Sequence, residues 1–240
     1  MQLHIYHEIN DTLVLPLNYQ HMLQAIIYRN LKSSYGYSDY IHNNGFMQNG
    51  RKFKLFTFSL LGGNYTINNK KMIFTKWLEF EVRSPEIFML KMLAENIQQN
   101  GICYGNQLFQ NVQTKLMDTT IENEELHIRM KSPCTVYSTD PDTKKTYYFT
   151  PADEEFPYMI NENFLRKYTA CFSIEPSSNI WIEPIYVTAK DKFVTKYKDF
   201  YICGFMGEYY LTGERKYLDF LYQTGLGSKN SQGFGMFDFI

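Results

Sequence analysis

The sequence predicts an α+β protein built from two ferredoxin-like units in tandem. Stretches in which apolar and polar residues alternate are typical of strands, and stretches with apolar residues three and four apart are typical of helices. In both halves of the 240-residue chain these stretches follow much the same order, βαββαβ, which is that of a ferredoxin-like unit. The predicted domains are residues 1–120 and 121–240, divided in the polar stretch DTTIENE.

In the first half the helices carry the clearest signals. NYQHMLQAIIYRNL has apolar residues at helical spacing, and Asn18 is its expected N-cap. SPEIFMLKMLAENIQQ begins with Ser84, a good capping residue, and Pro85 suits its first turn. Strands are expected at QLHIYHEI, KFKLFTFSLL, KMIFTKWLEFEV and NQLFQNVQTKL, with a turn at GGNYTINN between the second and the third.

The second half repeats the order of elements without a visible sequence repeat. Its helices are expected at ENFLRKYTACF and ERKYLDFLYQT. Its strands are expected at ELHIRMKSPCTVYS and YYFTP, which predict a hairpin, and then at WIEPIYVTA, KFVTKYKDFYICGFMGEYYL and GFGMFDFI.

Composition sets limits on the function. Apolar residues make up 44% of the chain, which is ordinary for a globular protein. The formal net charge is −1, whereas a typical nucleic-acid-binding domain is basic. A nucleic-acid surface would therefore be a local patch. Two such patches are present in the sequence: Arg51, Lys52 and Lys54, and a strand with Lys190, Lys192, Lys196 and Lys198 on one face.

The cysteines and the apolar runs point to a cytoplasmic protein. The four cysteines lie far apart, so they match no zinc-binding spacing, and free thiols in a reducing compartment are expected. The N-terminal stretch is not typical of a signal peptide. No apolar run approaches the roughly 20 residues of a membrane-spanning helix. No cofactor and no membrane partner are predicted.

The stretch GLGSKNSQGFGM, residues 225–236, stands between the last predicted helix and the last predicted strand. Gly225 is placed as a helix C-cap, and a glycine-rich loop can expose N–H groups that hold phosphates. It is not a P-loop, because no GK[ST] closes it, and it is not a dinucleotide fingerprint, because it follows a helix. A flexible connection without a ligand remains the alternative on these residues alone.

Three stretches together resemble one protein family. GLGSKNSQGFGM resembles the C-terminal glycine-rich signature of the CRISPR repeat-processing endoribonucleases of the RAMP superfamily. LQAIIYRNL resembles the N-terminal helix of that family, and YIHNNGF followed by KFKLFTFSLL resembles its histidine segment and next strand. The resemblance covers the whole chain in element order and implies two ferredoxin-like domains, as predicted above.

The resemblance implies metal-independent cleavage of precursor CRISPR RNA within each repeat. The ribose 2′-OH attacks the adjacent phosphorus, and the products carry a 2′,3′-cyclic phosphate and a 5′-OH. By position, His42, Tyr28 and Lys54 match the family's catalytic residues. Histidine suits acid–base work near neutral pH, and a lysine can balance the charge of the phosphorane.

Each of these assignments has an alternative. His42 could be a surface histidine, with His4, His7, His21 and His127 as the other candidates by type. Tyr28 could be an ordinary packed tyrosine, and Arg51 or Lys52 could take the place of Lys54. The residues expected to bind RNA are Arg51, Lys52, Gly225, Gly227, Ser228, Lys229, Asn230, Gly233 and Gly235.

The predicted partners are CRISPR repeat RNA and other subunits of a CRISPR interference complex, with the chain as a monomer or a homodimer. A second hypothesis is a non-catalytic RNA-binding subunit of the RAMP type with the same fold. A third is an unrelated two-domain protein that carries a glycine-rich loop by chance.

Overall fold

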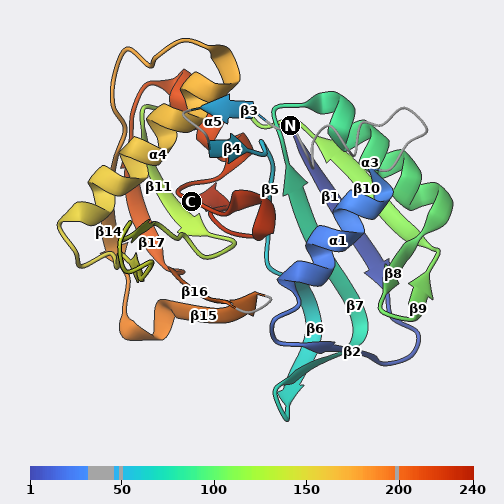
Figure 1. The fold of residues 1–240 in the computed structure, drawn as a ribbon. Coiled ribbons are helices and arrows are strands. Elements are labelled where there is room, and N and C mark those ends of the chain that lie inside the picture. Colours follow the sequence, from blue (N-terminus) through green and yellow to red (C-terminus); the bar gives the residue numbers. More distant parts are fainter. Residues whose placement is uncertain (32–45, 49–50, 198–199) are drawn as a thin grey trace.

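The computed structural model describes residues 1–31, 46–48, 51–197 and 200–240. The described residues form two main sheets, each covered by two helices, and four two-stranded hairpins. The last segment of the chain runs between the two halves (Figure 1). No described helix is both long enough and apolar enough to span a membrane.

The first half forms a ferredoxin-like unit. Its central strands pair antiparallel in the order β10-β1-β7, and β5 and β6 also pair with β7. Helices α1 and α3 pack against each other on one face. The elements are β1 (Gln2–Glu8), β2 (Leu13–Pro16), α1 (Gln20–Asn30), β5 (Thr57–Phe58), β6 (Gly62–Asn68), β7 (Lys71–Arg83), α3 (Ile87–Asn100), β8 (Ile102–Tyr104), β9 (Gln107–Phe109) and β10 (Val112–Met117).

The second half has the same topology. Its sheet has the order β14-β17-β11-β18, so the strands of both halves follow the predicted ferredoxin-like arrangement, and the predicted fold class is confirmed. The elements are β11 (Glu125–Met130), β12 (Tyr137–Thr139), β13 (Thr146–Tyr148), α4 (Glu155–Phe172), β14 (Trp181–Tyr186), η2 (Ala189–Asp191), β15 (Lys192–Tyr197), β16 (Phe200–Phe205), β17 (Glu208–Thr212), α5 (Arg215–Thr224), η3 (Asn230–Gln232) and β18 (Phe237–Phe239).

Three local expectations were wrong. Ser84 was expected to cap the second helix, with Pro85 in its first turn, but α3 begins at Ile87 and Glu86 is its N-cap. The stretch GGNYTINN was expected to be a turn, but it forms β6 with a register shift after Gly63, and the chain turns instead at Asn69 and Lys70, both at positive φ. Asn18 was expected to cap α1, but Tyr19 precedes the helix, and the Asn18 amide donates to the Lys196 carbonyl at 3.2 Å.

Two hydrophobic clusters mark the two halves, and one segment crosses between them. The hairpin of β3 (Phe46–Gln48) and β4 (Arg51–Phe53) belongs to the first half of the sequence. Phe46, Phe53 and the buried Leu55 nevertheless pack in the cluster of the second half. The division at residues 120/121 thus remains a prediction, with this hairpin as a connection across it.

A buried cluster of charges joins the two sheets. Arg83, at the end of β7, is 1% exposed and donates to the Phe237 carbonyl and to the carboxylates of Glu81 and Asp238. Its guanidinium lies 3.8 Å from the centre of the Tyr222 ring. Burial opposes ionisation of Asp238, but Arg83 and Lys131 hold its pKa below the usual range. The last strand is therefore held to the first sheet by paired charges.

We expect Arg83→Met to lower the free energy of unfolding by about 3 kcal/mol, because it leaves buried acceptors with one cation fewer. Equilibrium unfolding in urea measures this. Arg129→Met is the matched control, since Arg129 pairs with Glu208 at an exposed position and its loss should be much smaller. Equal losses for the two variants would show that the buried cluster is not what joins the sheets.

Candidate functional site

The glycine-rich loop between α5 and β18 is a packed element with a defined shape. Its residues at positive φ are Gly225, Gly227, Lys229, Gly233 and Gly235. Gly225 is the C-cap of α5, as predicted. At Gly235 a Cβ would collide with the Leu226 carbonyl, and at Gly233 it would meet the Phe58 ring. The glycines therefore allow the loop to lie against its own backbone and against β5.

Several N–H groups of this loop are used inside the protein. The N–H groups of Ser228 and Gly235 donate to the carbonyls of Thr135 and Pro133. The buried Asn230 amide donates to the carbonyls of Leu226 and Phe234 at 2.9 and 3.1 Å. The hydrogen-bonding groups of the Asn230 side chain thus hold the loop together. Contact of these residues with RNA remains a prediction.

Lys167 of α4 anchors the same loop and was missed from the sequence. It is 2% exposed, and its ammonium donates to the Gly225 carbonyl and to Asn230 Oδ1. Burial lowers the pKa of Lys167 to about 7, partly offset by the thiol of Cys134. The available signal was a lysine in line with Phe156, Ile160 and Phe164, on the buried face of a helix.

A cavity of about 500 Å³ opens beside the loop and collects cations from both halves. Lys52 and Lys54 come from the first half, and Lys167 and Lys229 from the second. Among the described residues that line it there is no carboxylate, so a phosphate would meet positive charge without a competing anion. The other lining residues are Gln24, Phe53, Tyr137, Thr139, Asn163, Gly227, Ser228, Asn230, Ser231 and Gln232.

Lys54 lines this cavity, and Tyr28 lies next to Lys54. Lys54 Nζ is 5.0 Å from the centre of the Tyr28 ring. Burial lowers the pKa of Lys54, and the neighbouring charge of Lys52 lowers it further. Tyr28 is half-buried against Phe56, with its hydroxyl shielded from solvent. Burial raises the pKa of Tyr28, so the phenol stays protonated at neutral pH.

The remaining candidates are placed as follows. His42 and the side chain of Arg51 lie outside the described part of the structure. His4 and His127 pair with Glu79 and Glu208, and the buried His7 lies 3.2 Å from the Tyr104 hydroxyl. These three have structural partners. His21 is exposed, and its ring meets the Asn18 carbonyl near the start of α1.

The basic strand is only partly a strand. Lys192 and Lys196 share the exposed face of β15, whereas Lys190 lies in η2, and Lys198 is outside the described residues. The hairpin β15–β16 reaches the first half, where Thr195 and Tyr197 donate to Gln20 and Gln24 of α1. The hairpin thus crosses the junction next to the cavity.

Two proteins of known family resemble this chain over more than nine-tenths of its length. A sequence profile described as "CRISPR associated protein Cas6, C-terminal" matches residues 113–239. A protein of Methanocaldococcus jannaschii named CRISPR-associated endoribonuclease Cas6 1 is 27% identical over 238 residues, which cover 93% of this chain and 86% of that protein. A Pyrococcus furiosus protein named CRISPR-associated endoribonuclease Cas6 is also 27% identical, over 92% of this chain and 82% of its own.

Solved structures agree in fold. A Cas6-related protein from Pyrococcus furiosus superposes with a TM-score of 0.83 at 22% identity, covering 100% of this chain and 98% of that one. A structure described as a CRISPR associated protein Cas6 gives a TM-score of 0.79 at 23% identity, over 100% of this chain and 99% of its own. Since the profile spans more than half of the sequence and the fold agrees over its whole length, the chain belongs to the Cas6 family of CRISPR-associated proteins.

Proposed function

We propose that the protein is an endoribonuclease that cuts precursor CRISPR RNA within its repeats. The observation that carries this proposal is the cavity between the two halves, where four lysines meet the glycine-rich loop beside Tyr28. Membership of the Cas6 family supports the same activity. So do the two relatives from Methanocaldococcus jannaschii and Pyrococcus furiosus, each of which is named an endoribonuclease. Association with other CRISPR subunits, the oligomeric state and the cytoplasmic location remain part of the proposal.

The proposed reaction is a transesterification without a metal ion. The 2′ oxygen attacks phosphorus and loses its proton to a base, the bond from phosphorus to the 5′ oxygen breaks, and that oxygen takes a proton from an acid. A 2′,3′-cyclic phosphate and a 5′-OH result. His42 is the candidate for proton transfer, because its ordinary pKa lies near neutrality.

The other two residues fit supporting roles. Burial keeps Tyr28 protonated and shields its hydroxyl, so Tyr28 suits a residue that positions Lys54 against its ring better than a general base. Lys54, over the same ring, would stabilise the negative charge that develops on the phosphorane. Lys52, Lys167 and Lys229 would hold flanking phosphates, which position the strand without reading its sequence.

We expect purified protein to cut the host's own repeat RNA at one site in EDTA, and His42→Ala to lower the rate by about 100-fold or more. Mapping of the fragment ends should find a cyclic phosphate. Tight binding without a cut would contradict the enzyme and leave an RNA-binding subunit. If His42→Ala cuts at the wild-type rate, another residue transfers the proton. The same assay would then be applied to variants of Tyr28, His21 and Lys54.

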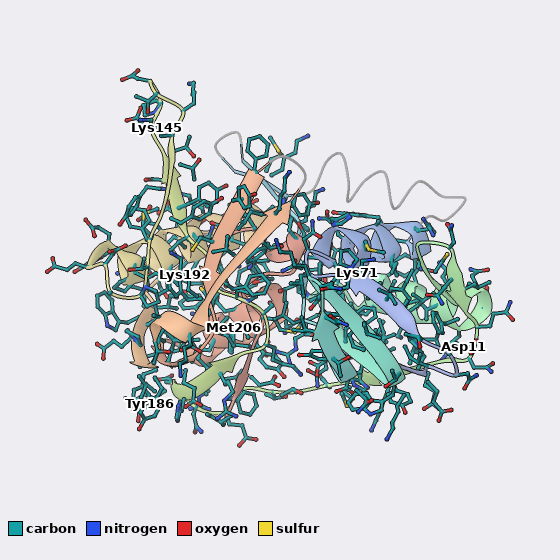
Figure 2. The ribbon with its side chains drawn as sticks, turned by 90° about the horizontal axis from the view of Figure 1, so that it is seen from below. Asp11, Lys71, Lys145, Tyr186, Lys192 and Met206 are labelled. Atoms are coloured by element: carbon teal, nitrogen blue, oxygen red, sulfur yellow. The ribbon has the colours of Figure 1, made fainter. Side chains whose placement is uncertain are left out.

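Lys229→Ala should weaken RNA binding and reduce the slope of log affinity against log salt by about 0.7, the value for one lost phosphate contact on a single strand. Fluorescence anisotropy at several salt concentrations measures this. Lys145→Ala is the control, because Lys145 lies at a projecting end of the molecule (Figure 2) and does not line the cavity. A salt slope that Lys229→Ala leaves unchanged would place the phosphates elsewhere.

RNA affinity should fall as pH rises from 6 to 8, because Lys167, with a pKa of about 7, loses its charge across that range. In Lys167→Met this pH dependence of RNA affinity should disappear. At pH 6 the variant should bind RNA about tenfold more weakly than the wild-type protein, which is the effect of losing one charge-assisted hydrogen bond. A role of Lys167 that does not depend on its charge would make the loss of affinity the same at every pH. Parallel pH profiles for the two proteins would therefore rule out contact between Lys167 and phosphate.

A further inference from the structure

A second cavity, of about 580 Å³, adjoins the lysine-lined one and has a different character. It lies between the hairpins β12–β13 and β15–β16. Five aromatic residues line it: Tyr137, Tyr148, Tyr197, Phe200 and Tyr201. Thr146, Val194, Ile202, Cys203, Lys229 and Gln232 complete the lining, so the described residues around it include no carboxylate.

The two cavities share a wall. Tyr137, Lys229 and Gln232 line both of them. At this boundary Lys229 Nζ lies 4.6 Å from the centre of the Tyr137 ring, which stands across the hairpin from the Tyr148 ring at 5.6 Å. A ligand that bridges the cavities would place an anionic group among the lysines and a flat group among the rings.

Two of the five rings of this cavity are presented to solvent. Phe200 is 73% exposed and Tyr201 is 67% exposed, although adjacent large aromatic side chains are normally covered. The wall also carries a polar group without a partner, because the amide oxygen of Gln232 is shielded from solvent and meets no hydrogen-bond donor among the described residues. A base has a face for stacking and an N–H edge that could satisfy this amide after a side-chain rotation.

We propose that this aromatic cavity binds one unpaired nucleobase of the RNA, stacked on Phe200 or Tyr201, while the adjoining lysines hold the phosphate of the same strand. The proposal rests on the proposed function, since it concerns the same RNA. The shared wall supports it, because the sugar-phosphate chain can pass from one cavity to the other at Lys229. Stacking is available to every base, so this site adds affinity and fixes register more than it selects sequence.

The first experiment compares the double variant Phe200→Ala/Tyr201→Ala with Tyr186→Ala. Tyr186 is the matched control, because it is as exposed as Tyr201, at 67%, and lines neither cavity. Binding of the single-stranded repeat RNA should weaken by about 5- to 150-fold in the double variant, the range for one base–aromatic stack. Tyr186→Ala should bind as the wild type does, and the unfolding midpoints verify that all three proteins are folded.

The second experiment locates the base. 2-Aminopurine, a fluorescent base, is placed at each position of the repeat in turn, and one position should be quenched by the wild-type protein and not by the double variant. RNA that is abasic at that position should bind equally weakly to both proteins.

The outcomes separate the two proposals. Wild-type protein that cuts the repeat, with a double variant indistinguishable from Tyr186→Ala, would overturn the base site and leave the endoribonuclease. Failure of the wild-type protein to bind the repeat would overturn both.

Discussion

The architecture depends on the path of the chain after α5. Residues 225–236 must pass between the two halves before β18 can pair with β11, and this path needs glycine where the loop touches its own backbone and β5. Thr57 of β5 donates to the Phe234 carbonyl, and Gln24 of α1 donates to the Ser231 carbonyl. The loop is therefore the surface on which the halves meet, and both cavities take part of their walls from it.

Charge is arranged around this loop in two ways. On one side, Arg83 is buried among Glu81 and Asp238, so its charge is neutralised inside the protein and serves to join the sheets. On the other side, four lysines converge where no described carboxylate lines the wall. A protein with a net charge of −1 can thus have a local positive site, because its described acidic residues lie outside the wall of this cavity. In the proposed function, the aromatic rings next to this site would add stacking with a base to the contacts with phosphate.

The order of elements and the glycine-rich stretch could be predicted from the sequence, because periodicity and turn chemistry are local properties. Lys54, Lys229 and Tyr28 were identified through resemblance, and the structure brings them to one place. The role of Lys167 could not be derived, because its partners Gly225 and Asn230 lie about 60 residues away and only packing joins them. The aromatic cavity was also missed, since its rings come from two hairpins whose contact no local pattern indicates.

The central claim is that RNA is bound and cut at the junction of the two halves, beside the glycine-rich loop. The most direct measurement is a crystal structure with the host's repeat RNA, made uncleavable by a 2′-deoxy nucleotide at the scissile position. We expect the scissile phosphate near Lys54 and Tyr28, with the neighbouring phosphates among Lys52, Lys167 and Lys229. RNA bound on the outer faces of the sheets, with the junction empty, would contradict the account.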